Sequence, residues 1–168
     1  MKYKFVFLFF AIISFTFCHA QIEVAHVSSK EFKSTGFGGF LNFSFPISDG
    51  KNYVIAEGGF QYFKADIDNL LFIPCVAGFR YTLNQSGTGF YVEPNAGYTF
   101  GAGDLQKHTQ DKLSGIATGV GIGYLFQPTG IIQFNISARY EHCFSNIATN
   151  TFSFRISHAF SFGRRRDD

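Results

Sequence analysis

Large apolar residues alternate with small or polar residues along most of the chain after residue 20. The clearest example is 152–162 (FSFRISHAFSF), in which every second residue is apolar apart from one histidine, opposite serines, an arginine and an alanine. Successive side chains of a strand point to opposite faces of a sheet, so a period of two predicts strands with one very apolar face. Clusters of Gly, Asp, Asn, Ser and Pro separate the alternating segments. The predicted strands are 21–31, 36–46, 52–64, 71–83, 90–101, 115–126, 132–144 and 152–162.

The number of these segments predicts how the sheet closes. No run after residue 20 is apolar over about 18 residues, and no long stretch carries a helical apolar stripe, which excludes a helical membrane protein. Seven strands could not close an antiparallel sheet, so 21–31 is expected to pair with the last strand. Eight short strands joined by short turns fit residues 21–168. We therefore predict an all-β fold, an eight-stranded antiparallel up-and-down transmembrane β-barrel.

The face opposite the large apolar residues decides between a membrane barrel and a soluble one. It is poor in Lys and rich in Gly, Ala, Ser and Thr, and charged residues make up only 15% of the chain, against roughly 25% in soluble domains. Small residues suit a narrow lumen, whereas the large apolar face suits lipid. A soluble secreted β-protein is the alternative. Aromatic residues near the strand ends are expected to form interfacial girdles: Tyr62, Tyr81, Tyr98, Tyr124, Tyr140 and Phe162.

Charge and cysteine usage narrow the classes of function. The net charge of +2 leaves no electrostatic footprint for nucleic acid, so no nucleic-acid partner is expected. Cys75 lies on the predicted outward face and Cys143 on the inward face, which argues against a disulfide between them. The spacing of Cys and His does not resemble a zinc site, and we expect neither a metal nor another cofactor.

The first twenty residues have the features of a secretory signal. Lys2 and Lys4 precede an apolar stretch, 5–17, and a short segment ending at Ala20 provides the cleavage site. We predict a cleaved signal peptide over 1–20 and an exported domain over 21–168. A membrane anchor is the alternative, but the apolar stretch is shorter than the roughly 20 residues of a spanning helix.

The whole of 21–168 resembles the small outer-membrane β-barrel domains of Gram-negative bacteria, and is similar in size to the eight-stranded OmpA and OmpX type. The resemblance rests on the signal peptide, the strand count and the Phe-x-Phe pattern of Phe152, Phe154, Phe160 and Phe162. It implies a monomer in the cell outer membrane, surrounded by outer-membrane lipid and inserted by the barrel-assembly machinery. One departure is that such chains usually stop at an aromatic residue, whereas here six residues follow Phe162.

The resemblance also implies that both termini are periplasmic, which orients the connections. Those near 47–51, 84–89 and 127–130 are then periplasmic. The external connections lie near 32–36, 65–69, 102–113 and 145–150, and the longest one is among them, as in known barrels. These outer loops are the expected place for an extracellular ligand.

Six charged residues are predicted to face the lumen: Glu57, Arg80, Glu93, Arg139, Glu141 and Arg155. A buried ion costs several kcal/mol to desolvate, so these groups must pair. Pairing across neighbouring strands predicts two clusters, one of Glu141, Arg155 and Arg139, and one of Arg80 and Glu93 with Glu57 nearby. We interpret them as a structural plug, with a gated polar path as the alternative.

The predicted function is therefore that of an outer-membrane barrel with a plugged polar lumen and a structural or surface-interaction role, not an enzyme. Two alternatives remain open. A lipid-modifying enzyme could use His26 and Ser28, which share a face, but no positioned acid accompanies them and no catalytic residue is assigned. A transporter of small hydrophobic solutes would need an apolar lumen and a lateral opening.

Overall fold

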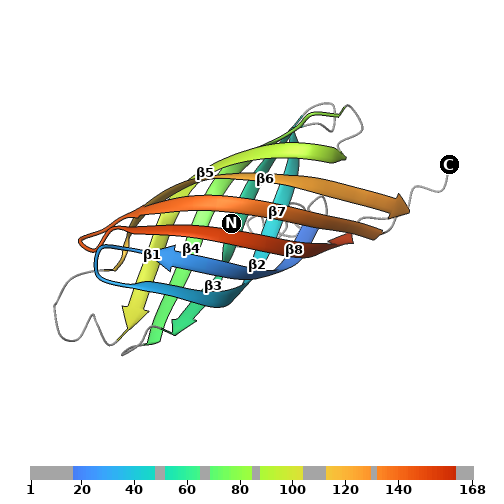
Figure 1. The fold of residues 1–168 in the computed structure, drawn as a ribbon. Helices are drawn as coiled ribbons and strands as arrows, with labels where there is room; N and C mark the ends of the chain where they lie inside the picture. Colours follow the sequence, from blue (N-terminus) through green and yellow to red (C-terminus); the bar gives the residue numbers. More distant parts are fainter. Residues whose placement is uncertain are drawn as a thin grey trace, which may run out of the picture.

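The computed structural model is a single closed barrel of eight strands (Figure 1). It describes residues 17–47, 52–64, 69–84, 88–103, 113–129 and 132–161. In this part of the chain no helix is long and apolar enough to cross a membrane. The strands are β1 (Phe17–Ser28), β2 (Lys33–Ile47), β3 (Asn52–Lys64), β4 (Asn69–Thr82), β5 (Gly89–Gly103), β6 (Gly115–Thr129), β7 (Ile132–Phe144) and β8 (Thr149–Ser161).

Every strand pairs antiparallel with its neighbours in the sequence, and β1 closes the barrel against β8. Ile22 of β1 pairs with Ile156 of β8, and the two strands lie side by side in Figure 1. Closure leaves no strand edge unpaired, which a bilayer requires because it offers no water to exposed peptide groups. The predicted eight-stranded antiparallel barrel, including the closing role of its first strand, is confirmed.

The first hairpin differs from the prediction. A turn at 29–32 replaces the predicted loop near 32–36, and β2 begins at Lys33. The Ser29 hydroxyl accepts hydrogen bonds from the backbone N–H groups of Glu31 and Phe32, at 3.1 and 3.0 Å. This serine-centred turn ends the strand earlier than the alternation alone indicates.

The start of β1 also lies elsewhere than predicted. The strand begins at Phe17, so four of its residues precede the predicted cleavage point after Ala20. Residues 1–16, which hold most of the predicted signal peptide, lie outside the described residues. The cleavage of this segment stays a prediction.

The two faces of the barrel have opposite character, as predicted. Large apolar side chains are exposed on the outer face of every strand, with Ile22 at 69% and Phe154 at 61%. An exposed apolar surface of this extent is unfavourable in water and favourable in hydrocarbon. Of the predicted girdle residues, Tyr81, Tyr98 and Tyr140 are exposed, and Tyr62 and Tyr124 are half-buried. Phe162 lies outside the described residues.

The predicted positions of the two cysteines are also confirmed. Cys75 is exposed on the outer face and Cys143 is buried in the lumen, and both are free thiols. Side chains on opposite faces of the wall cannot approach closely enough for a disulfide bond.

Glycines allow the wall to curve tightly around a narrow lumen. A Cβ atom at Gly36 would collide with the carbonyl oxygen of Tyr62 and would lie 2.7 Å from a ring carbon of Phe63. At Gly121, on the opposite wall, the nearest atoms to such a Cβ lie at 3.7 Å. Contacts as short as those at Gly36 force the backbone to shift, since close-packed interiors do not absorb extra atoms.

We therefore expect Gly36→Ala to lower the free energy of unfolding by about 1–3 kcal/mol. Gly121→Ala is the matched control, because its methyl group meets ordinary van der Waals contacts, and we expect near wild-type stability. Urea unfolding of the protein refolded into lipid vesicles, followed by circular dichroism, measures both changes. Equal losses in the two variants would contradict this account of wall curvature.

Candidate functional site

The connections of the barrel define its two ends. The turn at 29–32 and the connection 145–148 lie at one end, together with the end of β3, the start of β4, the end of β5 and the start of β6, and we call it the loop end. The other end, which we call the terminal end, holds the start of β1 and the end of β8. The lumen between these ends is the candidate site, together with a groove on the surface of the loop end.

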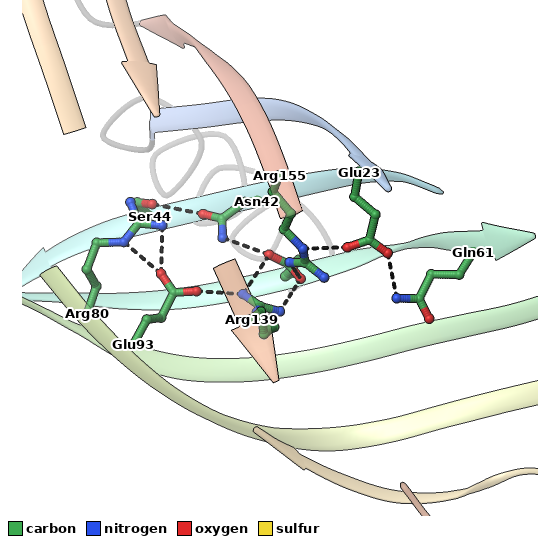
Figure 2. Close-up of polar contacts among 9 residues, drawn as sticks. Glu23, Asn42, Ser44, Gln61, Arg80, Glu93, Arg139 and Arg155 are labelled. Carbon is green, nitrogen blue, oxygen red and sulfur yellow. Dashed lines mark hydrogen bonds and ion pairs between the residues drawn. The ribbon is translucent and has the colours of Figure 1, made fainter. Parts of the chain in front are cut away.

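Six buried charged side chains form one continuous chain of ion pairs across the middle of the lumen (Figure 2). Each of them is at most 5% exposed. They come from strands β1, β3, β4, β5, β7 and β8, so opposite walls of the barrel are joined. We call them the lumen network: Glu23, Glu57, Arg80, Glu93, Arg139 and Arg155.

The central member of the lumen network is Glu57. Its Oε1 atom accepts hydrogen bonds from Arg139 at 2.6 Å and from Arg155 at 2.7 Å. Its Oε2 atom accepts a longer bond from Arg139, at 3.2 Å, and one from the Asn42 amide at 3.1 Å. Charge-assisted hydrogen bonds of this kind are roughly twice as strong as neutral ones. One carboxylate therefore holds two guanidinium groups from adjacent strands.

The network continues in both directions from Glu57. Toward β4 and β5, Arg139 also donates to Glu93 at 2.6 Å, and Glu93 accepts from Arg80 at 2.7 Å. Toward β1, Arg155 donates to Glu23 at 2.6 Å. The three carboxylates and three guanidinium groups balance, so the desolvation cost of each ion is offset by its partners.

Neutral side chains complete the surroundings of these charges. Gln61 donates to Glu23 at 2.6 Å, and Ser44 donates to the oxygen of Asn42 at 3.0 Å. Two aromatic rings cover guanidinium groups: Arg80 lies 4.4 Å from the centre of the Tyr91 ring, and Arg155 lies 4.2 Å from that of Phe40. Cation–π contacts of this kind stabilise a desolvated cation.

The prediction of two separate clusters is wrong. Arg80 does pair with Glu93, but Glu57 binds Arg139 and Arg155 instead of joining that pair. Glu141 is buried at 7% exposure, yet it belongs to no ion pair among the described residues. The prediction paired only strands that are neighbours in sequence, whereas a narrow lumen lets long side chains from opposite walls meet.

Glu23 was absent from the predicted set because 21–31 shows the weakest alternation. The signal that could have revealed it is local: Ile22 and Val24 face outward, so Glu23 between them must face the lumen. Asn42 and Gln61, which also bind the network, were missed because uncharged residues carry no pairing requirement that a sequence can show.

The loop end of the lumen is apolar, a feature that the prediction of a plugged polar lumen did not include. Seven buried residues pack together there, and the Phe63 and Phe72 rings meet edge to face at 5.7 Å. Phe32, from the first turn, packs against them. We call the group the loop-end cap: Ala25, Val27, Phe63, Leu70, Phe72, Leu113 and Ile147. The cap packs the loop end of the lumen beyond the lumen network.

A small polar cavity lies on the other side of the network, toward the terminal end. Its volume is about 50 Å³, which corresponds to one or two water molecules. The lining residues are His19, Ser44, Tyr53, Arg80, Leu125 and Gln133. A cavity of this size and polarity accommodates water.

His26, the histidine considered for catalysis, lies on the outer face, as does His142. The Nδ1 atom of His26 lies 3.0 Å from the Thr35 hydroxyl on β2, and no hydrogen bond among the described residues links His26 to Ser28. His142 contacts Asn150 through Nδ1, at 2.8 Å. Across the described strands and turns, no group of three or more His, Cys, Asp or Glu side chains is placed to hold a metal ion.

A groove of about 440 Å³ opens on the surface of the loop end. It lies between the first turn and the β7–β8 connection, because β1 and β8 are neighbours in the closed sheet. We call it the loop-end groove, and its lining residues are Ser28, Ser29, Lys30, Glu31, His142, Asn146, Ile147, Ala148 and Asn150. Its lining combines polar side chains with apolar surface, to which Ile147 and Ala148 contribute.

The sequence matches no protein-family model and no curated protein. Its fold, in contrast, matches solved structures along most of the chain. Neisserial surface protein A superposes with a TM-score of 0.56 at 16% identity, covering 87% of this chain and 95% of that one. Ail, the attachment invasion locus protein of Yersinia pestis, gives a TM-score of 0.57 at 15% identity and covers 86% and 97%.

A third similar structure is the N-terminal β-barrel domain of Pseudomonas aeruginosa OprF, with a TM-score of 0.50, 11% identity and coverage of 84% and 97%. These structural neighbours are small outer-membrane β-barrels. The resemblance expected from the sequence is thereby confirmed for the fold.

Proposed function

We propose that this protein is a closed barrel of the bacterial outer membrane, with a structural and surface-interaction role and no pore. The observation that carries the proposal is the filled lumen, in which the lumen network and the loop-end cap lie one above the other. The apolar outer face of all eight strands supports a membrane location. The similar structures of outer-membrane proteins support the outer membrane in particular.

The energetics of the network argue against conduction and against transport. A solute could pass only if it separated these ion pairs, whose residues are at most 5% exposed. Separating one pair leaves a buried charge without its partner, at a cost of about 3–5 kcal/mol. The apolar surface of the cap does not extend through the lumen, because the network interrupts it. A path for hydrophobic solutes is therefore less favoured than a plug.

The outer-face contacts favour a non-enzymatic role. A serine nucleophile needs a base within hydrogen-bond reach and an acid that orients the base. His26 contacts Thr35 instead, and His142 contacts an amide, not a carboxylate. One surface feature available for function is the loop-end groove, which is built from two connections at the end proposed to face outward.

Location can be tested by fractionation and gel mobility. We expect the protein in the outer-membrane fraction, and we expect unheated samples to migrate differently from boiled samples because a closed barrel resists cold detergent. A boiled sample of the same preparation is the internal control. Recovery in the soluble periplasmic fraction, without a mobility shift, would contradict the membrane location.

Closure can be tested separately with the purified protein in planar lipid bilayers. We expect no stepwise conductance from the wild-type chain, because the lumen network blocks the path. Gel mobility of the same sample confirms that the barrel is folded. Regular conductance steps from folded wild-type protein would contradict the plug and would favour the gated polar path.

A further inference from the structure

We infer that the loop-end groove binds a saccharide. The inference rests on the proposed function for its location, since it takes the loop end to face the outside of the cell. The volume of about 440 Å³ falls within the roughly 300–1,000 Å³ typical of small-molecule sites. Three observations define the ligand: rigid walls, interleaved donors and acceptors, and an aromatic flank.

The walls of the groove are held in place before any ligand binds. On one side, Ser29 fixes the first turn through hydrogen bonds from Glu31 and Phe32. On the other side, the Ser145 hydroxyl donates to the carbonyl oxygen of Ile147 at 2.7 Å, and Ile147 is buried in the loop-end cap. A rigid site loses little conformational entropy on binding, which favours affinity for a small ligand.

Asn150 lies at the lower edge of the groove with its side chain oriented by two neighbours. Its Oδ1 atom accepts a hydrogen bond from the Tyr140 hydroxyl at 2.7 Å and contacts Nδ1 of His142 at 2.8 Å. An amide oxygen only accepts, so a proton on Nδ1 of His142 would make this contact a hydrogen bond and would leave Nε2 as an acceptor in the neutral ring. No hydrogen bond among the described residues uses the Nδ2 group of Asn150, which is left as a donor.

The remaining lining residues add further donors and acceptors side by side. Lys30 and Asn146 bring hydrogen-bond donors, and Glu31 brings a carboxylate acceptor. The hydroxyl of Ser28 can both donate and accept a hydrogen bond. Sugar hydroxyl groups donate and accept together, so a saccharide satisfies such a set. An apolar ligand would leave these groups without partners, and a simple anion would be repelled by Glu31.

Aromatic side chains lie on the outer face at the loop end of β7, where His142 lines the groove. Tyr140, His142 and Phe144 occupy successive outward positions, and the rings of His142 and Phe144 meet at 4.4 Å. Phe144 is 58% exposed. An exposed ring offers an apolar surface to the C–H face of a sugar ring.

The position of the groove leaves two sources for the sugar. It lies directly beyond the outward apolar side chains of β8, of which Phe152 is 46% exposed. In a membrane this is the level of the headgroups, so the sugar is either the headgroup of a glycolipid or a free saccharide. The chemistry of recognition is the same in both cases, and the experiment separates them.

The test uses the full chain, folded and checked by gel mobility. One arm titrates the barrel with the oligosaccharide released from lipopolysaccharide. The other arm compares the protein in phosphatidylcholine vesicles with and without intact lipopolysaccharide. We expect saturable binding by the wild-type protein in at least one arm and a roughly tenfold weakening in Asn150→Ala, the effect of losing one or two hydrogen bonds. Asn84→Ala is the matched control, an exposed asparagine at the terminal end.

Each outcome decides the inference. Binding of the free oligosaccharide assigns a soluble sugar ligand, and binding only in vesicles assigns a glycolipid headgroup. Absence of binding in both arms, or equal affinities of the wild-type and Asn150→Ala proteins, would overturn the site. If Asn150→Ala does not fold, Asn146→Ala replaces it, because Asn146 lies in a connection and not in a strand. A folded, non-conducting barrel that binds no saccharide would refute this inference alone.

Discussion

Replacing Glu57 by Gln is expected to lower the free energy of unfolding of the barrel by about 3–5 kcal/mol, the usual cost of leaving a buried charge without its partner. Glu57 is the shared carboxylate of Arg139 and Arg155, with N···O distances of 2.6 and 2.7 Å. An amide keeps the shape but not the charge. Both guanidinium groups would then face an N–H donor or a weaker acceptor in a space from which water is excluded.

This prediction can be measured by urea unfolding of the protein refolded into lipid vesicles. The chain has no Trp, so circular dichroism and gel mobility are the suitable probes. Glu141→Gln is the matched control: Glu141 is also a buried lumen glutamate, but no ion pair among the described residues includes it. We expect a much smaller loss there. Similar losses in the two variants would show that the lumen network does not depend on Glu57.

The second large effect is expected for Phe63→Ala, which removes a fully buried ring from the loop-end cap. Phe63 is 0% exposed and packs edge to face on Phe72. Truncation of a fully buried phenylalanine leaves a cavity and costs about 3–5 kcal/mol. The loss should equal that of a core mutation in a soluble protein, because the cap packs protein against protein.

The same urea unfolding measurement tests the cap. Phe60→Ala is the matched control, since Phe60 lies on the same strand but faces outward with 45% exposure. Its ring contacts lipid in the proposed membrane setting, and lipid chains can fill the space that the substitution leaves. We expect a clearly smaller loss for Phe60→Ala. If the order of the two losses were reversed, the cap would not be a packed core.

Much of the fold follows from local patterns in the sequence. The predicted segments 52–64 and 132–144 coincide with β3 and β7 at both ends. Alternation with a period of two is decided by neighbouring residues in one strand, so it also predicted which side chains face outward. The first hairpin departs from it because Ser29 forms a turn through its own hydroxyl, a local contact that competes with the strand pattern.

The composition of the lumen was predictable only in part. The inward positions of Glu57, Arg139 and Arg155 follow from strand parity alone. The apolar cap does not, because inward Leu70 and Phe72 lie on a strand whose outward positions are also apolar. The outward face of this strand was still assigned correctly, as the exposed Cys75 shows. No local pattern shows, however, that inward apolar side chains from different strands meet, because only the closed barrel brings them together.

The sequence by itself determined the eight strands, the orientation of their faces, the antiparallel order and the burial of six charged residues, although not that of Glu23. Only the tertiary structure decided which charges meet: Glu57 binds Arg139 and Arg155, and Glu141 stays outside the network. The physical reason is distance. Strand identity depends on residues one or two positions apart, whereas these contacts join residues 82 and 98 positions apart. They are set by the curvature and stagger of the closed wall, which no local pattern records.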